Sequence, residues 1–248
     1  MRPFPRSSLA VIVFALIALH ARAAEKPNLL FLFADDMTWK AVNALSDEDI
    51  DTPHLDRLAD YGTSFTHAYN SGAWHGAVCV ASRTMLNTGY QLWRAQEIEP
   101  RLKDFPQRKR TWSQWLSTAG YRTCLTGKWH VLLPTEPIFD EVRHRRPGMP
   151  GSVPGAYERP IDVQPDPWHP ADRSLGGFWK GGKHWSEVVV DDFAAFLGSE
   201  DPRPWFMYVA FNAPHDTRQS PQEYLDRYPL ERMKMPENFL PVYPHRDA

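Results

Sequence analysis

Cysteine is scarce in this 248-residue chain, which contains only Cys79 and Cys124. Two cysteines so far apart, with scattered histidines, do not make a structural zinc site. Charge of one sign is not in excess either, because the formal net charge is −2. Phosphate binding needs a basic face, so this balance argues against nucleic acid as an obligatory partner.

Several familiar sequence motifs are also missing. The chain has no glycine-rich phosphate loop and no Gly-x-Ser-x-Gly nucleophile motif. It shows no internal repeat, no convincing domain linker and, after residue 23, no apolar segment long enough to cross a membrane. These absences favour one globular domain over a repeat or membrane protein.

The first 23 residues are typical of an export signal. Arg2 and Arg6 precede an uninterrupted apolar run over residues 9–19, and small residues suited to cleavage follow it. The run is shorter than the roughly 20 residues of a spanning helix, although an uncleaved membrane anchor is the alternative. We therefore expect an exported protein, periplasmic or secreted, with no stable membrane span after signal cleavage.

Strand and helix patterns alternate along the rest of the chain. Apolar runs that end at Asp35 and at His215 are typical of buried parallel strands, and a shorter strand leads into Lys128. Helical patterns cover residues 51–62, 79–89, 110–121 and 186–199, and residues 63–70 alternate like a further strand. The proline- and glycine-rich region 134–182 predicts a long loop. This order predicts an α/β fold, a largely parallel sheet with helices on both faces.

Asp35 and Asp36 directly follow the first apolar run. Open α/β sheets bind ligands at the carboxyl ends of their strands. Two adjacent carboxylates repel each other, and a hard cation such as Ca²⁺ or Mg²⁺ relieves that repulsion. The position therefore indicates a metal site, and a solvated acidic turn is the alternative.

The sequence CVASR, residues 79–83, places Cys79 and Arg83 on one face of an expected helix. Cys79 would lie near the helix N-terminus, where backbone N–H groups face an anion. The pair suits a nucleophile that attacks an anionic group while Arg83 holds its charge. The alternatives are a buried structural cysteine and, in an exported chain, a disulfide with Cys124.

Three further side chains stand where predicted strands end. Lys128 can hold an anionic oxygen as a point charge. His130 and His215 can each move a proton near neutral pH. Taken singly, each of the three would more commonly be an ordinary surface residue.

Taken together and in order, these segments resemble the type I sulfatases, which have an alkaline-phosphatase-like fold. The matching segments are KPNLLFLFADDM, DTPHLDRLADYGTSFTHAY, CVASR, GYRTCLTGKWH and FMYVAFNAPHD. The core motif of that family is Cys or Ser, any residue, Pro or Ala, any residue, and Arg. Residues 79–83 fit it, with Ala81 in place of the commoner proline. The resemblance runs from about Lys26 to the end of the chain.

The resemblance implies that a formylglycine-generating maturation enzyme oxidises Cys79 to Cα-formylglycine, an aldehyde that adds water to give a geminal diol. One hydroxyl would attack the sulfur of a sulfate ester, and the alcohol would leave. Loss of the second hydroxyl proton would then expel sulfate and restore the aldehyde. The implied substrate is an organic sulfate ester, and export together with abundant tryptophan favours a sulfated glycan over other small molecules.

The roles of the family's site residues carry over position by position. Asp35 and Asp36 match ligands of a metal ion, Ca²⁺ in preference to Mg²⁺, which would also contact the oxygen formed at Cys79. Arg83 matches the residue that steadies the formylglycine and the metal-site charge. Lys128 matches a sulfate contact.

The histidines match proton-transfer groups. His130 corresponds to the base beside the diol, and His215 to a sulfate contact or proton donor near the leaving oxygen, a role that Lys128 could share. Trp74 and His75, upstream of the nucleophile, are candidates to line the substrate site. Packing beneath the nucleophile loop is the alternative for both.

The sequence also departs from the family. Members are longer, and their second half supplies a further Asp and Asn to the metal and a further lysine to the sulfate. We therefore expect residues 24–248 to be the N-terminal, incomplete part of a sulfatase catalytic domain, truncated at the C-terminus, poorly stable and inactive alone. The alternative functions are a phosphonate monoester or phosphodiester hydrolase of the same superfamily, and a non-catalytic remnant.

Overall fold

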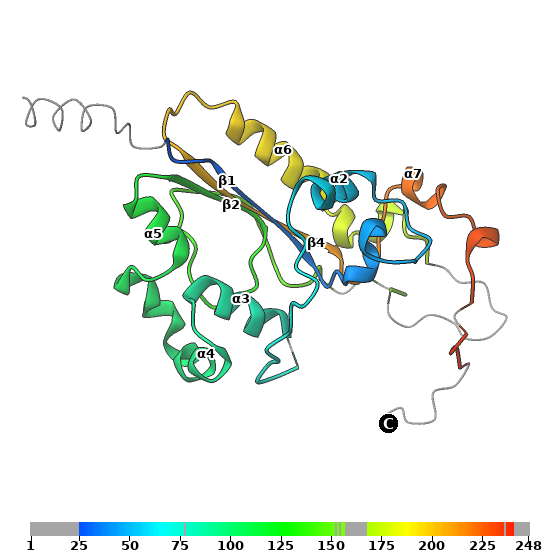
Figure 1. Ribbon diagram of the computed structural model, residues 1–248, viewed down its shortest axis with the longest axis horizontal. Helices are drawn as coiled ribbons and strands as arrows, with labels where there is room; N and C mark the ends of the chain where they lie inside the picture. Colours follow the sequence, from blue (N-terminus) through cyan, green and yellow to red (C-terminus); the bar gives the residue numbers. More distant parts are fainter. Residues whose placement is uncertain are drawn as a thin grey trace, which may run out of the picture.

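A four-stranded parallel sheet forms the centre of the chain (Figure 1). A computed structural model describes residues 25–76, 78–151, 153, 155–156, 168–235 and 237–240. In spatial order the strands are β1 (Leu29–Asp35), β4 (Trp205–Pro214), β2 (Arg122–Lys128) and β3 (Glu141–Arg146). Each neighbouring pair is parallel, so the predicted α/β fold with a largely parallel sheet is confirmed.

Helices and short 3-10 segments connect and cover the strands. The α-helices are α2 (Pro53–Tyr61), α3 (Val78–Thr88), α4 (Leu92–Ile98), α5 (Trp112–Thr118), α6 (Trp185–Leu197) and α7 (Gln222–Leu225). The 3-10 helices are η1 (Trp39–Ala41), η2 (Asn43–Leu45), η3 (Glu99–Arg108), η4 (Arg173–Leu175), η5 (Gly177–Trp179) and η6 (Leu230–Arg232). Among the described helices, none is both long and apolar enough to cross a bilayer. The predicted export signal, residues 1–23, lies outside the described residues.

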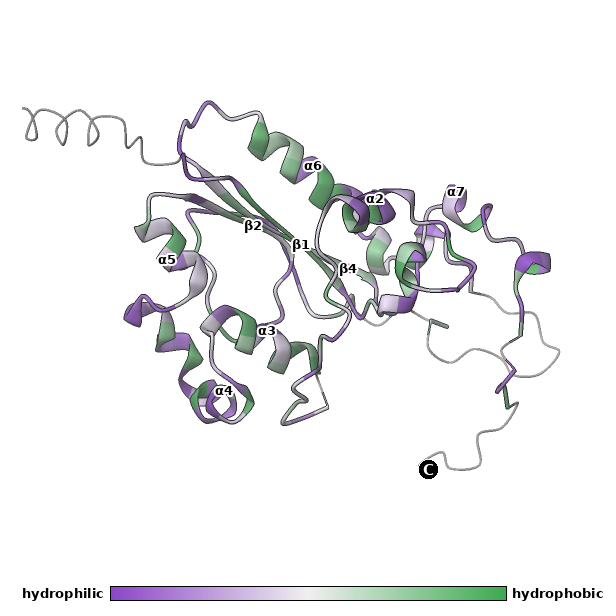
Figure 2. Cartoon of the chain, viewed as in Figure 1, coloured by the Kyte–Doolittle hydropathy of each residue, from purple (hydrophilic) through white to green (hydrophobic). Residues whose placement is uncertain are grey.

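Helices pack on both faces of the sheet, as predicted (Figure 1). Helices α3, α4 and α5 contribute with η3 to one core, and α6 forms a second core on the opposite face. Along β4, Phe206 and Tyr208 enter the first core, and Met207 and Val209 enter the second. This alternation explains the continuous apolar run, because a strand covered on both faces needs apolar side chains at every position. Figure 2 shows the apolar residues gathered along the strands and α6.

Strand β1 is buried on one face only. Phe31 and Phe33 pack against the first core, whereas Leu30 and Leu32 are 42% and 49% exposed. The prediction of a buried strand is therefore wrong for this second face. The reason is position: β1 is the edge of the described sheet, and α6 packs mainly over β4 and β2.

The strand predicted for residues 63–70 is wrong. The segment forms a turn and irregular backbone, and its Phe65 and Tyr69 are almost fully exposed. Alternating polar and apolar residues favour a strand only where another strand offers backbone partners and a core accepts the apolar side chains. Among the residues that the structure describes, this segment has neither a partner strand nor a core against its apolar side chains.

Strand β3 lies inside the region 134–182, for which the sequence predicts only a loop. Its sequence, EVRHRR, is highly charged and shows no apolar alternation. The strand sits at the sheet edge and is partly exposed, so its side chains do not need to be apolar. Backbone pairing with β2 defines it, which a hydrophobic pattern cannot reveal.

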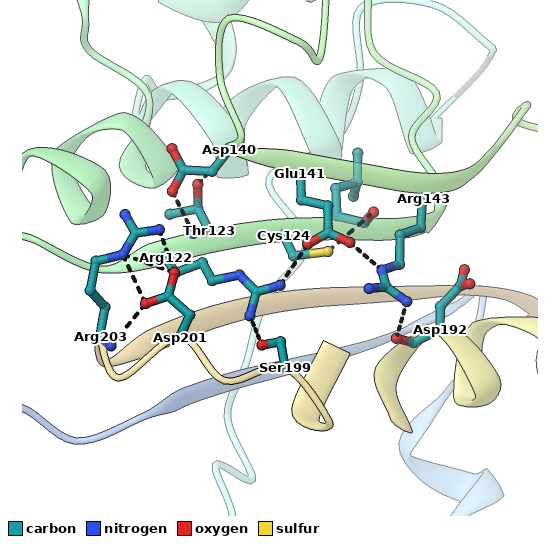
Figure 3. Close-up of polar contacts among 11 residues, drawn as sticks. Arg122, Thr123, Cys124, Asp140, Glu141, Arg143, Asp192, Ser199, Asp201 and Arg203 are labelled. Atoms are coloured by element: carbon teal, nitrogen blue, oxygen red, sulfur yellow. Dashed lines mark hydrogen bonds and ion pairs between the residues drawn. The ribbon is translucent and has the colours of Figure 1, made fainter. Parts of the chain in front are cut away.

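Cys124 lies on β2 beside a network of polar side chains (Figure 3). Glu141 of β3 accepts hydrogen bonds from Arg122, at 2.8 Å, and from Arg143. Arg143 also donates to the backbone carbonyl of Asp192, at 3.1 Å. The network ties β2, β3 and α6 together and leaves Cys124 enclosed within the fold.

The two cysteines do not form a disulfide, because both are free thiols. Cys124 is fully buried, and this burial raises the pKa of its thiol to about 12. A thiol with so high a pKa is unreactive at neutral pH. The disulfide alternative is therefore wrong, and Cys79, which is partly exposed, is the thiol open to chemistry.

Stability should fall as the pH drops below 6.5, the ordinary pKa of histidine. His184 caps α6: its Nδ1 accepts from the Ser186 N–H, and its Nε2 donates to the Gln219 carbonyl. Burial lowers the pKa of His184, so below pH 6.5 the unfolded chain binds more protons than the folded chain. His184→Asn keeps a capping oxygen without the titration. Denaturant unfolding at pH 5 to 7.5 should show a shallower pH dependence for this variant, and an unchanged dependence would contradict the assignment.

Candidate active site

The carboxyl ends of three parallel strands bring the predicted site residues to one edge of the sheet. Asp35 ends β1, Lys128 ends β2, and His215 follows β4. Helix α3 adds Cys79 in its first turn and Arg83 one turn later. This is the edge at which open α/β sheets bind ligands.

Asp35 is the centre of a buried ionic cluster. Its carboxylate pairs with the Arg83 guanidinium at 3.1 Å and with the Lys128 ammonium in closer contact. Arg83 also donates to the Lys128 carbonyl at 2.8 Å, and its guanidinium lies 4.5 Å from the centre of the Phe33 ring. The three charged side chains are almost wholly buried, so each depends on the others for compensation of its charge.

The Cys79 thiol lies against this cluster. Its Sγ is 3.6 Å from Asp35 Oδ1 and 3.6 Å from Lys128 Nζ. Ligand atoms of Asp35, Cys79 and His215 all lie within 4.8 Å of one another. Two cationic side chains and one carboxylate leave a net positive charge beside the sulfur, which favours an anionic group there.

His130 packs on a glycine that leaves room for its ring. A Cβ placed on Gly148 would lie 2.3–2.4 Å from His130 Cε1, Nδ1 and Cγ. Nδ1 is buried and has no hydrogen-bond partner among the residues the structure describes. Burial, followed by the charges of Lys128 and Arg83, lowers the pKa of His130. The lowered pKa favours the neutral imidazole at pH 7.

Asn212 supports this arrangement, and the sequence reasoning missed it. Its amide, buried on β4, donates to the Pro147 carbonyl at 3.1 Å and to the Gly148 carbonyl at 3.4 Å. The side chain thus holds the backbone on which His130 rests. Asn212 stands three residues before His215, and this position could have indicated a role at the site. No sequence pattern near Gly148 indicated a role for that residue.

Replacing Gly148 with alanine should displace the His130 ring. The added Cβ would overlap the imidazole, and overpacking of this kind costs about 1–3 kcal/mol. Movement away from Lys128 and Arg83 should bring the pKa of His130 back toward 6.5. NMR titration of the imidazole protons measures this shift. Gly198→Ala is the control, because a Cβ there makes only ordinary contacts. An unchanged titration in Gly148→Ala would show that Gly148 does not hold the His130 ring in place.

Three predicted site residues lie apart from the Asp35–Cys79–His215 cluster. Asp36 is exposed, with a backbone φ of 60°, and is not among the grouped metal-ligating side chains of the described residues. Trp74 donates to Glu99 at 2.8 Å, and His75 lies 3.5 Å from the same carboxylate. Glu99, which the sequence did not single out, thus ties this segment to η3.

The cluster supplies only part of a metal shell. Asp35 offers carboxylate oxygens, but Arg83 and Lys128 already engage both of them, and the other donors are a thiol and an imidazole. Ca²⁺ takes about six to eight oxygen ligands, and Mg²⁺ demands octahedral oxygen coordination. The described residues by themselves therefore do not fit either ion.

Comparison with known proteins identifies the family. A sequence model of the protein family named Sulfatase matches residues 27–243 of this chain. The chain belongs to the sulfatase family. The resemblance seen in the motifs is thereby confirmed for nearly the whole sequence, including the segments that carry Cys79, Lys128 and His215.

Two curated relatives show how much of a sulfatase this chain covers. It is 28% identical to an N-acetylglucosamine-6-O-sulfatase of Bacteroides thetaiotaomicron, over 77% of this chain and 31% of that protein. It is 27% identical to an ulvan-active sulfatase of Formosa agariphila, over 89% of this chain and 42% of that protein. The chain therefore spans less than half the length of these curated relatives.

A solved structure shares the fold. With a TM-score of 0.60 and 23% identity, the chain resembles a protein solved with its substrate D-glucosamine-2-N,6-O-disulfate, over 86% of this chain and 40% of that one. This likeness confirms the predicted alkaline-phosphatase-like architecture of the sulfatases. The partial coverage agrees with a chain that contains one part of that architecture.

Proposed function

We propose that this protein is an exported sulfuric ester hydrolase that releases sulfate from a sulfated glycan. Residues 24–248 would form part of its catalytic domain. Membership of the sulfatase family supports the reaction. The names of the relatives, an N-acetylglucosamine-6-O-sulfatase and an ulvan-active sulfatase, support a carbohydrate substrate.

The observation that carries the proposal is the position of the Cys79 sulfur, 3.6 Å from both Asp35 and Lys128 at the C-terminal edge of the sheet. Once a maturation enzyme has converted Cys79 to formylglycine, its hydrated aldehyde would supply both the nucleophile and the release step. The side chain is partly exposed, so a substrate can reach it. Cys79 stands in the first turn of α3, and the backbone N–H groups of a helix N-terminus favour an anion.

The surrounding residues bind the anion and move protons. Lys128 and Arg83 would hold the charge of the sulfate group, because Asp35 neutralises only one of the two cations. His130, neutral at pH 7, would accept a proton from the nucleophile at Nε2. His215, which lies in the cluster of Asp35 and Cys79, would contact the sulfate or protonate the leaving oxygen.

A divalent metal at Asp35 and Asp36, Ca²⁺ in preference to Mg²⁺, belongs to the same proposal. It requires additional oxygen ligands from outside the described cluster, and the Asp36 carboxylate would have to turn toward Asp35. Trp74 and His75 would line the approach to the site above Glu99.

The alternative is a phosphonate monoester or phosphodiester hydrolase. The fold resembles a phosphonate monoester hydrolase of Agrobacterium radiobacter, with a TM-score of 0.53 and 18% identity over 80% of this chain and 43% of that one. Calorimetry can measure how phenyl sulfate and a phenyl phosphonate monoester compete for binding to the matured chain, which separates the two functions. Tighter binding of phenyl sulfate supports the sulfatase function.

Mass spectrometry of the peptide that contains Cys79 tests the proposal. The chain should be co-produced with a formylglycine-generating enzyme, and Cys124 serves as an internal control because its thiol is buried. We expect the mass change from a CH₂SH to a CHO side chain at Cys79 and an intact thiol at Cys124. An unmodified thiol at both positions would favour a non-catalytic chain.

A further inference from the structure

A cavity of about 610 Å³ lies beside the candidate active site. It opens between the end of β3 and the segment from η4 to the start of α6. Its lining includes Arg145, Arg146, Pro147, Lys180 and Trp185. We propose that it binds a second anionic group, a sulfate or a carboxylate, of the glycan whose sulfate ester is cleaved at Cys79. This inference rests on the proposed function and specifies its substrate as a glycan with at least two negative charges.

Arg146 lines this cavity with a partly buried, cationic side chain. Its guanidinium stacks on the Trp185 ring, 4.5 Å from the ring centre, which fixes the plane of the group. Its Nε is buried without a hydrogen-bond partner among the residues that the structure describes. Burial of this cation is costly, and a charge-assisted contact between the guanidinium and an anion in the cavity would offset part of that cost.

The charge of the lining favours the same ligand. Arg145, Arg146 and Lys180 contribute three cations, and no acidic side chain is among the described residues that line the cavity. Asp192, the carboxylate whose charge acts on Arg146, is already engaged by Thr126. The cavity therefore retains net positive charge that a sulfate or carboxylate would neutralise.

The cavity shares a wall with the candidate active site. Arg146 is the register partner of Lys128, and its carbonyl accepts from the Trp129 N–H at 3.1 Å. Pro147 lines the cavity, and the next residue, Gly148, carries the His130 ring. Residues 146–148 thus contact both the cavity and the residues that surround the candidate active site, and a glycan bound at Cys79 could extend past them into the cavity.

Binding of three sulfated disaccharides to the full chain tests this inference. One carries a single sulfate and no other charge, one carries two sulfates, and one carries a sulfate and a carboxylate. We expect the two doubly charged ligands to bind about tenfold more tightly, as one charge-assisted hydrogen-bonded contact predicts. Their relative affinities show whether sulfate or carboxylate is preferred.

Variants then locate the second contact. Lys180→Gln and Arg146→Met should remove most of the tenfold advantage and leave the affinity for the singly charged ligand unchanged. Lys180 is exposed, so its variant stays informative if loss of the Arg146 stacking impairs folding. Lys183→Gln is the matched control, because Lys183 pairs with Asp191 and does not line the cavity.

The outcomes separate this inference from the proposed function. Equal affinity for singly and doubly charged ligands, equal losses in Lys180→Gln and Lys183→Gln, or no binding of any ligand would overturn the cavity assignment. Binding of doubly charged ligands that depends on Lys180, with a thiol that is never matured at Cys79, would contradict the proposed reaction and leave the anion site standing.

Discussion

Asp35→Asn is expected to lower the free energy of unfolding by about 3–5 kcal/mol, the range typical of a broken buried ion pair. The substitution keeps the shape of the side chain and removes its charge. Arg83 and Lys128, both almost fully buried, would then face each other without a counterion. Urea unfolding of the variant and of the unaltered chain measures the difference.

Asp36→Asn is the matched control for this prediction. Asp36 is the adjacent aspartate, is exposed, and adopts a left-handed backbone that asparagine tolerates well. Its change should stay within about 0.5 kcal/mol, as is usual for surface substitutions. Adding Lys128→Met to Asp35→Asn should recover part of the loss by removing one unpaired cation. Similar effects for the two aspartates would contradict the buried cluster.

Gly127→Ala should destabilise the fold by about 3 kcal/mol, through overpacking together with a left-handed backbone. Gly127 lies in β2 with a φ of 90°, at the register shift between β2 and β3. An added Cβ would lie 1.8 Å from the Ala210 carbonyl oxygen of the neighbouring strand β4. The two central strands would have to separate next to Lys128, because backbone atoms cannot rotate out of the way as a side chain can.

Thermal unfolding of Gly127→Ala and Gly198→Ala compares the effect of an added Cβ at a closely packed glycine with its effect at a glycine that has room for it. Gly198 ends α6 with a φ of −71°, and its added Cβ would lie 3.7 Å from the nearest atoms. We expect a clear drop in Tm for Gly127→Ala and little change for Gly198→Ala. A Tm for Gly127→Ala equal to that of the unaltered chain would show that β2 and β4 are less closely packed than the structure indicates.

The sequence was informative wherever one physical pattern determined the structure. Apolar strands that end in Asp35, Lys128 and His215 predicted a common edge, because the carboxyl ends of parallel strands meet there. The helical spacing of Cys79 and Arg83 predicted a shared face, and both reach Asp35. These inferences needed only local periodicity and the polarity of a parallel sheet.

The features that escaped prediction depend on contacts between distant segments. The ring of His130 rests on Gly148, which Asn212 holds from another strand. No local pattern encodes such a contact, since it arises only when β2, β3 and β4 are assembled. The charged strand β3 was missed for the same reason: its backbone partners, and not its side chains, define it.

Alkylation of Cys79 in the unmodified chain tests most directly whether its side chain lies in an anion-attracting site. Rates with iodoacetate, an anion, and iodoacetamide, which is neutral, should be compared with those of a free cysteine peptide and followed by mass spectrometry. The account predicts an iodoacetate-to-iodoacetamide ratio at least about tenfold above that of the peptide, lost in Lys128→Met, with Cys124 unreactive. A ratio equal to that of the peptide, or equal labelling of Cys79 and Cys124, would contradict it.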